Sequence, residues 1–413
     1  MGSRYEVAVV FPEKAYYNRS NNNKSNNDKR KSLECFDGKR NSDEKNKMKR
    51  KRGFLEFYGG GVETLATIKD VARKANVSIS TVSHVINQTK HVNPDTAQRV
   101  KEAIKELNYK TNIFAKNLKS QSTKQIGVLV TDICGLFFPY VIKEICREAN
   151  KNGYTVTLVD SGADIELERK GLATLADSCV DGIILSSAVL TEQKEEYAAW
   201  LWELLSAGAK RIPLVMMERD FTAYGIDSIC TDTYTGGLKA MEHLIGLGCS
   251  YIAHITTPYI QEGRYFAYRT ALENHQIPYR RDYVETGDYT HESGYLCMKE
   301  ILSKKLPLDG VFVSNDQMAL GAVAALREAG RRIPEDVKVI GFDDVFICES
   351  MEPTLSSVHI DKELLGRKSI SLLLDRLQEK DVPYPYKETV ESRLVVRGST
   401  DKNAVMQSTW ECR

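Results

Sequence analysis

The stretch Ala66-Thr-Ile-Lys-Asp-Val-Ala-Arg-Lys-Ala-Asn-Val-Ser-Ile-Ser-Thr-Val-Ser-His-Val-Ile-Asn87 decides the fold of the N-terminal part of this 413-residue chain. Thr67 and Asp70 have the spacing of a capping box, and apolar residues follow them at helical intervals, which predicts a first short helix. The pattern breaks at Asn76, and Ser78 is a favourable N-cap for a second amphipathic helix. Two short helices joined by a tight turn indicate a helix-turn-helix.

A third helix is expected to support the first two. Asn93-Pro94 combines a good N-cap with the proline that favours the first helical position. The residues expected to face inward on this helix are Ala97, Val100, Ile104 and Leu107. We therefore expect an all-α domain over residues 65–110.

The second helix presents a short polar face opposite its apolar side. That face carries Ser80, Thr81 and His84, flanked by Ile79 and Ser83. Hydroxyls and an imidazole can hydrogen-bond base edges, and methyl groups can contact thymine. A short polar helix face is more often plain solvated surface, so the DNA-reading interpretation depends on the order of the three helices and on the surrounding Lys and Arg residues.

Charge is distributed unevenly along the chain. The net charge is only +1, yet the first 124 residues contain 26 Lys and Arg against 13 Asp and Glu. A basic front part on an acidic body indicates a nucleic-acid-binding module joined to a domain with another task. We expect residues 1–64 to be a basic, disordered extension, whose simplest role is that of a solvated tail. Alternatively, a start codon at Leu65 would make part or all of residues 1–64 a misassigned gene start.

From residue 125 to residue 400, short β-branched runs alternate with helical stretches. The strand candidates are 126–130, 155–159, 182–186, 213–217, 251–255, 310–314 and 337–342, and the helix candidates are 139–152, 166–178, 234–247, 264–275, 291–304 and 316–329. This alternation predicts α/β architecture with parallel sheets covered by helices on both faces. The segment is too long for one comfortable sheet, so we expect two doubly wound lobes with a ligand between them, at the carboxyl ends of the strands.

The run 66–87 and its continuation to Lys105-Glu-Leu-Asn-Tyr109 closely resemble the headpiece of the lactose/galactose repressor family. The DNA contacts that the helix face and this resemblance together suggest are Thr67, Ser78, Ile79, Ser80, Thr81, Ser83, His84 and Asn87. In that family a hinge helix forms on operator DNA and drives a leucine into the minor groove. The matching residues, in the expected hinge and linker 111–124, are Asn112, Ala115 and Leu118, with Leu118 at the wedge position. Thr111 stands where relatives usually have proline, which makes the start of the hinge less rigid.

The resemblance continues through residues 125–400 and implies a periplasmic-binding-protein-like core. It is carried by motifs such as Asn315-Asp316-x-x-Ala-x-Gly321 and Gly341-Phe-Asp-Asp344. In sugar-sensing members, residues matching Arg264 and Asp316 hold ligand hydroxyls or a ring oxygen. A guanidinium donor and a carboxylate acceptor together suit vicinal hydroxyls, although a structural ion pair across the cleft is the alternative.

Three further positions match the pocket of that family. Phe138 and Tyr289 match aromatic pocket positions that can stack on the apolar face of a sugar, and core filling is the equal alternative for each. Glu218 stands where many relatives have aspartate. A longer carboxylate changes the depth of the pocket, which puts any particular sugar in doubt.

Two other classes of protein compete with a regulator. An enzyme would need a recognisable site, and none of Gly-x-Ser-x-Gly, His-Glu-x-x-His or Gly-x-x-x-x-Gly-Lys-Ser/Thr occurs. A solute-binding protein without DNA function would share the α/β part, but it requires a signal peptide and no helix-turn-helix. Nine cysteines occur without a Cys-x-x-Cys pair, so we expect reduced thiols, no metal and no cofactor.

A ligand-controlled transcription repressor accounts for the helices, the charge and the missing catalytic motifs together. Its expected partners are operator double-stranded DNA with an inverted repeat, a second copy of the chain, and a small sugar-like effector. No leucine heptad follows residue 400, so we expect a homodimer and a flexible tail over residues 401–413. The chain lacks a signal sequence and any apolar run of about 18 residues, which predicts a cytoplasmic protein without a membrane partner.

Overall fold

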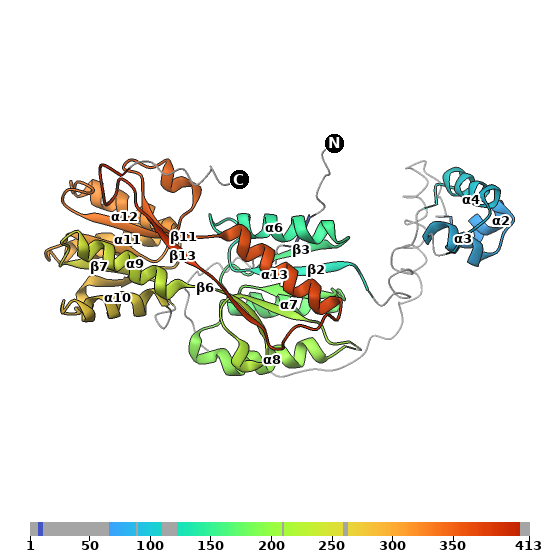
Figure 1. The fold of residues 1–413 in the computed structure, drawn as a ribbon, viewed down its shortest axis with the longest axis horizontal. Helices are drawn as coiled ribbons and strands as arrows, with labels where there is room; N and C mark the ends of the chain where they lie inside the picture. The colour runs from blue at the N-terminus through green and yellow to red at the C-terminus, as the bar shows by residue number, and fades with distance from the viewer. Residues whose placement is uncertain are drawn as a thin grey trace, which may run out of the picture. The chain divides into compact units, whose positions relative to one another are not determined.

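The computed structural model describes residues 7–10, 66–87, 90–109, 122–208, 210–258 and 263–404 (Figure 1). These residues fall into a helical unit before residue 122 and an α/β unit that holds the rest, and each is described by itself. The expected hinge residues Asn112, Ala115 and Leu118 lie outside the described residues, as do residues 1–6 and 11–64 of the expected extension.

The described residues of the helical unit form α2 (Ile68–Ala75), α3 (Ile79–Asn87) and α4 (Pro94–Glu106). At the start of α2 the Asp70 carboxylate accepts a hydrogen bond from the Thr67 backbone N–H at 2.9 Å. Asn76 makes the tight turn between α2 and α3 with a φ of 52°, a left-handed conformation that asparagine tolerates well.

The other two helices begin at side-chain caps. The Ser78 hydroxyl accepts a hydrogen bond from the Thr81 backbone N–H at 3.0 Å, and the Asn93 side chain accepts one from the Asp95 N–H at 2.9 Å. The buried core of the unit is small and joins all three helices: Val71, Ala72, Ala75, Val82, Val100 and Ala103. The three predicted helices are therefore confirmed together with their predicted starts.

The first lobe of the α/β unit is built on a seven-stranded parallel sheet of order β1-β3-β2-β4-β5-β6-β12. Its strands are β1 (Val7–Val10), β2 (Gln125–Val130), β3 (Thr155–Asp160), β4 (Gly182–Leu185), β5 (Leu214–Glu218), β6 (Asp227–Thr231) and β12 (Lys387–Val390). One face is covered by α6 (Phe138–Lys151) and α13 (Lys362–Leu377), the other by α7 (Ile165–Asp177) and α8 (Lys194–Ser206).

The second lobe is built on a six-stranded sheet of order β13-β11-β10-β9-β7-β8, in which only β13 runs antiparallel to its neighbour. Its strands are β7 (Ile252–Thr256), β8 (Val284–Thr286), β9 (Gly310–Val313), β10 (Lys338–Asp343), β11 (Ser356–Ile360) and β13 (Ser392–Val395). The helices are α9 (Thr233–Gly246) and α10 (Gly263–Asn274) on one face and α11 (His291–Ser303) and α12 (Asp316–Glu328) on the other. Short 3₁₀ turns lie at Thr191–Gln193, Thr222–Tyr224, Arg281–Tyr283 and Phe346–Glu349.

The chain passes between the lobes at three places. It leaves the first lobe after β6 and enters α9, returns after β11 into α13, and crosses again between β12 and β13. Figure 1 shows α13 lying with the first lobe although the strand before it, β11, belongs to the second. Each lobe is therefore assembled from segments that are far apart in the sequence.

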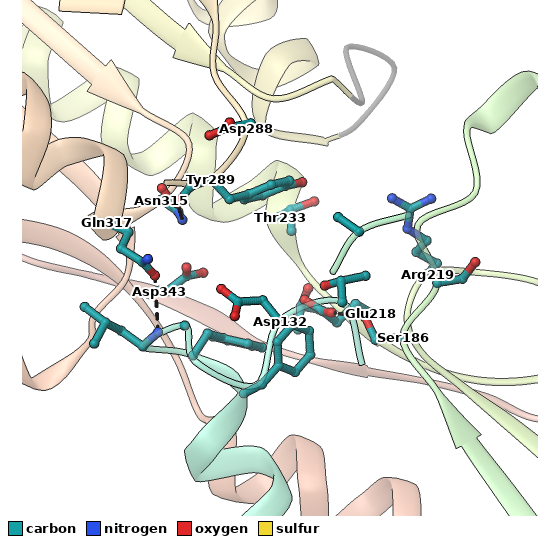
Figure 2. Close-up of a pocket in the computed structure, with 18 of the residues that line it drawn as sticks. Asp132, Ser186, Glu218, Arg219, Thr233, Asp288, Tyr289, Asn315, Gln317 and Asp343 are labelled. Atoms are coloured by element: carbon teal, nitrogen blue, oxygen red, sulfur yellow. Dashed lines mark hydrogen bonds between the residues drawn. The ribbon is translucent and has the colours of Figure 1, made fainter. Parts of the chain in front are cut away.

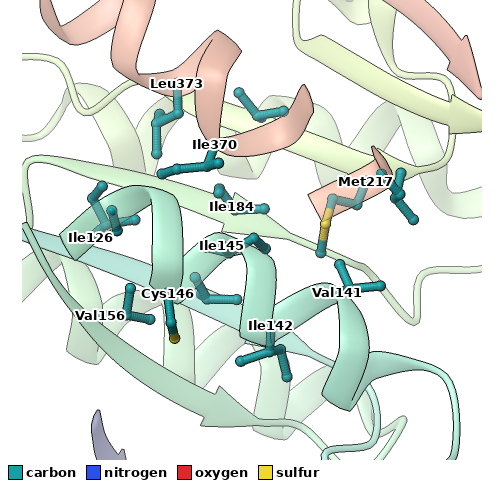
Figure 3. Packing of buried hydrophobic residues seen from close by; sticks show 14 of the residues in the cluster. Ile126, Val141, Ile142, Ile145, Cys146, Val156, Ile184, Met217, Ile370 and Leu373 are labelled. Carbon is teal, nitrogen blue, oxygen red and sulfur yellow. The ribbon is translucent and has the colours of Figure 1, made fainter. Parts of the chain in front are cut away.

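Helix α13 is a main support of the first lobe. Ile370 and Leu373 of this helix pack over the sheet beside Ile145 of α6 (Figure 3). The two helices approach closely at Gly366, where a Cβ atom would lie 2.5 Å from the Val141 carbonyl oxygen. Any larger residue at position 366 would push α13 away from α6.

The expected fold class, with two parallel α/β lobes and a separate helix-turn-helix, is confirmed, but the list of strand candidates was incomplete. It omitted β6, β8, β11, β12 and β13. Within the expected extension 1–64, Val7–Val10 forms an edge strand beside β3. The edge of β3 supplies backbone hydrogen-bond partners that so short an apolar run lacks in isolation.

Candidate functional site

A cavity of about 530 Å³ lies between the two lobes. It is lined by the segments that follow the carboxyl ends of β2, β3, β4, β5 and β6 in one lobe and of β7, β8, β9 and β10 in the other. This is where open parallel sheets place their ligands, because the loops after the strands converge there. The volume lies within the usual range of small-molecule pockets, roughly 300 to 1,000 Å³.

The wall formed by the first lobe is polar. Asp132 follows β2, and Figure 2 shows its carboxylate directed into the cavity. Glu218, the last residue of β5, accepts a hydrogen bond from the Ser186 hydroxyl at 2.7 Å. Arg219 also lines the cavity, and its guanidinium donates to the Val189 carbonyl. This wall therefore offers acceptors for hydroxyl or amine donors beside one guanidinium.

The wall formed by the second lobe combines an arginine, an amide and a carboxylate. Arg264 at the start of α10 donates to the Ser314 carbonyl at 2.7 Å, and its guanidinium lies 4.9 Å from the centre of the Phe342 ring. Asn315 lines the cavity after β9, and Asp343 lines it at the end of β10. Burial raises the pKa of Asp343 well above its ordinary value, and the nearby Arg264 charge opposes that shift.

The structure does not place Asp316 in the cavity wall. Its carboxylate accepts hydrogen bonds from the Ser357 hydroxyl at 2.6 Å and the Val345 backbone N–H at 2.9 Å, and only 1% of the residue is exposed. Burial raises the pKa of Asp316 to about 6. Asp343 lines the cavity in the same lobe as Arg264, so its carboxylate is a further candidate partner for a ligand held by Arg264.

The other four residues expected to bind an effector all line the cavity. They are Phe138, Glu218, Arg264 and Tyr289. Phe138 packs edge-on against Phe137, with ring centres 5.3 Å apart, and is 8% exposed, so it also belongs to the core of the first lobe. The Tyr289 side chain extends across the cavity in Figure 2.

Four residues that line the cavity have a strained backbone conformation. Among the lining residues, Ala163, Glu218, Tyr289 and Asp343 have φ angles of 58°, 65°, 73° and 101°. Residues other than glycine rarely adopt positive φ, and such strain is typically retained where it serves a site. Sequence reasoning missed Asp132, Ser186 and Asp343, although each follows or ends a predicted strand at its carboxyl end.

A buried carboxylate supports the first wall from behind. Glu168 of α7 accepts hydrogen bonds from the Ser187 hydroxyl at 2.6 Å, the Ala188 N–H at 2.7 Å and the Tyr197 hydroxyl. Burial raises the pKa of Glu168 above its ordinary value, and the bonds from Ala188 and Ser187 oppose that shift. Ser187 itself lines the cavity, so this network fixes the loop after β4.

The expected DNA-reading residues of the helical unit lie at the start and along one side of α3, except Thr67, which caps α2. Thr67, Ser78, Ile79 and Ser80 are exposed, and Thr81, Ser83 and His84 are half-buried. Hydroxyls of Ser80 and Thr81 hydrogen-bond the Ser78 hydroxyl at 2.7 and 2.8 Å. Asn87 is the last residue of α3, and its side chain lies outside the described residues.

In the part of the chain that the structure describes, no group of three or more His, Cys, Asp and Glu side chains is arranged to hold a metal ion. No described helix is long and apolar enough to span a membrane. A helix-turn-helix unit and a two-lobed unit with a polar cavity together define a class of protein, the ligand-binding regulators of transcription.

Comparisons with known proteins identify the family. The model of the bacterial regulatory proteins of the lacI family matches residues 67–112, and that of the periplasmic binding protein-like domain matches residues 241–400. The HTH-type transcriptional repressor PurR of Pectobacterium atrosepticum is 39% identical over 76% of this chain and 92% of its own length. PurR of Serratia proteamaculans is 36% identical over 81% of this chain and 98% of its own. The chain belongs to the lacI family: it is a DNA-binding transcriptional repressor with a ligand-binding regulatory domain, from a family without enzymatic activity.

Solved structures agree with this assignment. A lac repressor dimer bound to operator and the anti-inducer ONPF has a TM-score of 0.72 and 28% identity, covering 82% of this chain and 99% of its own. A complex of the transcriptional regulator CelR with cellobiose has a TM-score of 0.59 and 31% identity, covering 81% and 99%. A solute-binding protein without DNA function is excluded, because the lacI match covers the helix-turn-helix.

Proposed function

We propose that this repressor binds its operator as a homodimer and changes its operator affinity when a small polar metabolite occupies the cavity between the lobes. The observation that carries the proposal is the presence of Arg264 and Asp343 in one cavity wall, with Asp132 and Glu218 lining the cavity from the other lobe. Donors and acceptors then surround the ligand from both lobes, so binding favours one lobe orientation over others.

The proposed effector is sugar-like. Carboxylates at Asp132, Glu218 and Asp343 accept hydrogen bonds from hydroxyls, and Arg264 donates. Tyr289 offers an aromatic face for an apolar ring surface. A purine is the second candidate, because the name PurR of the curated relatives suggests it and an aromatic face also stacks on a base.

The proposed DNA site is an inverted repeat. Two headpieces related by the two-fold axis of a dimer would read two half-sites, with Ser80, Thr81 and His84 at the base edges and Thr67, Ser78, Ile79, Ser83 and Asn87 beside them. A hinge within 111–124 that carries Asn112, Ala115 and Leu118 would link this reading to the sensor, 125–400. The repressor would act in the cytoplasm, on chromosomal DNA.

A thermal-shift screen of sugars, phosphosugars and nucleobases tests the effector proposal. A compound at about 100 times its dissociation constant adds roughly 2.7 kcal/mol to the free energy of unfolding. The shift should disappear in Asp343→Asn and persist in Asp381→Asn, a matched control at an exposed position. A shift that persists in Asp343→Asn would place the compound elsewhere.

Footprinting and competition binding test the DNA proposal. His84→Ala should weaken operator binding by roughly 1 to 3 kcal/mol and relax the sequence preference, because a base contact is lost. Equal weakening on operator and random DNA would assign His84 to the phosphate backbone. A single asymmetric half-site would contradict the dimer.

A further inference from the structure

Lys362 lies where the chain returns from the second lobe to the first. It is the first residue of α13 and follows β11 by a single residue. Its side chain is nearly buried, with 9% exposed, and its Nζ donates to the carbonyls of Asp343, Asp344 at 3.1 Å and Ile360 at 3.0 Å. All three protons of the ammonium group therefore have backbone acceptors.

The carbonyls that Lys362 holds belong to a strained pair of residues. Asp343 and Asp344 have φ angles of 101° and 52°, a costly conformation for two consecutive residues with side chains. Their carboxylates point to different surroundings. Asp343 lines the cavity, whereas Asp344 accepts hydrogen bonds from Arg397 at 2.7 Å and His359 at 2.9 Å. The ammonium group is thus placed to stabilise the turn that directs Asp343 into the cavity.

Lys362 also contacts the opposite wall. Its Nζ lies 6.0 Å from the centre of the Phe137 ring, which lines the cavity from the loop after β2 in the first lobe. One buried side chain at a chain crossing therefore bonds a cavity residue of the second lobe and lies near a cavity residue of the first.

The other two crossings are tied to each other. The Asp232 backbone N–H donates to the Val390 carbonyl at 3.0 Å, and the Ser392 hydroxyl donates to the Asp232 carbonyl at 2.8 Å. These bonds join the first crossing to the third, whereas the Lys362 bonds join the second crossing to the cavity wall.

We infer that Lys362 is a positioning residue that makes the Asp343-Asp344 turn and the first turn of α13 move as one body. The consequence of this linkage for the effector response rests on the proposed function. A ligand that contacts Asp343 would, through Lys362, also shift the start of α13, where the chain returns from the second lobe to the first. The linkage itself is a property of the free protein and can be measured without any effector.

Hydrogen exchange of the full chain, followed by mass spectrometry, tests the linkage. In Lys362→Met, peptides that cover 341–346 and 360–365 should both exchange about tenfold faster or more, because the three carbonyls lose their shared donor. Lys362→Arg, which keeps a charged donor, should restore most of the protection. Lys368→Met is the matched control, since that lysine lies on the same helix and pairs with Glu388 at a partly exposed site.

The outcomes separate positioning from general stabilisation. Faster exchange confined to the two segments, with the core strands β7 and β9 unchanged, supports the inference. Unchanged exchange at both segments overturns it, and so does a uniform increase that includes β7 and β9 or one that Lys368→Met reproduces. If Lys362→Met does not fold, Lys362→Gln, which keeps an amide donor, is measured against the same criteria. A negative effector screen would leave this result intact, so failure of the linkage and failure of the proposed effector site are distinguishable.

Discussion

The side-chain carbonyl oxygen of Gln317 accepts a hydrogen bond from the Leu136 backbone N–H at 3.2 Å, and this bond crosses the cavity from the second lobe to the first (Figure 2). The Leu136 side chain reinforces it by packing against the apolar core of the second lobe. The loop after β2 is thus held by both lobes.

Gln317→Ala should loosen this loop. Removing the acceptor leaves the Leu136 N–H without its bond across the cavity, so amide exchange in residues 133–138 should rise several-fold, consistent with a loss of roughly 1 kcal/mol. Hydrogen exchange measures it, with Gln378→Ala at the end of α13 as the control. If the loop exchanged at the same rate in both variants, the bond would not stabilise the loop.

Asp316→Ala should lower stability, because the Val345 N–H and the Ser357 hydroxyl both lose a buried acceptor. The expected cost is roughly 1 to 3 kcal/mol in the free energy of unfolding, measured by urea denaturation. Asp381→Ala serves as the exposed control. Unchanged stability together with a lost effector response would indicate that Asp316 binds the effector.

His254 should make stability fall between about pH 6.5 and pH 4. It lies buried on β7 between Tyr268 and Phe312, both rings 4.9 Å away, and burial lowers its pKa to about 4. Below about pH 6.5 this histidine binds a proton in the unfolded chain, whereas in the folded chain it binds one only below about pH 4. Acid therefore lowers the free energy of unfolding, by up to about 3 kcal/mol for this one group.

The comparison of wild type with His254→Phe isolates this contribution. Phenylalanine keeps a ring between the two neighbours and does not titrate. As the pH falls from 6.5 to 4, the free energy of unfolding of the wild type should therefore fall relative to that of the variant. Urea denaturation at each pH measures both values. A difference that stays constant over this range would show that His254 does not titrate as its burial indicates.

Ser78→Ala should destabilise α3 without touching the sensor. The Thr81 N–H loses its cap, which typically costs about 1 kcal/mol, so exchange of the first α3 amides should quicken. Gln98→Ala, an exposed position on α4 whose amide bonds only Glu102 in the described structure, is the control. Equal exchange in the two variants would mean that the cap contributes nothing.

The helix-turn-helix could be predicted closely because its information is local. Capping residues such as Thr67, Ser78 and Asn93 mark where helices begin, and the apolar spacing marks what they bury. These signals do not depend on contacts between distant segments, and the structure contains all three predicted helices.

The sensor could be predicted as a class but not strand by strand. β12 pairs with β6, and β13 pairs with β11, although neither has the long apolar run of a central strand. Which sheet each strand joins is decided by the three crossings between the lobes, and these depend on packing across the molecule. The repeated helix and strand pattern therefore indicated two lobes without indicating where one ends.

The sequence singled out Asp316 and not Asp343 for a similar reason. Both are acidic residues beside the carboxyl end of a strand in the second lobe. Only the tertiary structure shows that Ser357 and Val345 bind the carboxylate of Asp316 and leave Asp343 to line the cavity. A stricter use of the rule that ligands gather at strand ends would have named Asp132 and Asp343 as further candidates.

The interleaving of the lobes has a consequence for synthesis on the ribosome. A helical headpiece with local contacts can fold soon after it emerges, whereas the first lobe waits for α13 and β12, which come from the last part of the chain. A nascent chain that stops before Lys387 leaves the outer edge of β6 without its partner strand. Neither lobe can therefore mature ahead of the other, and the two sheets should reach their native form together, after nearly all of the polypeptide has left the exit tunnel.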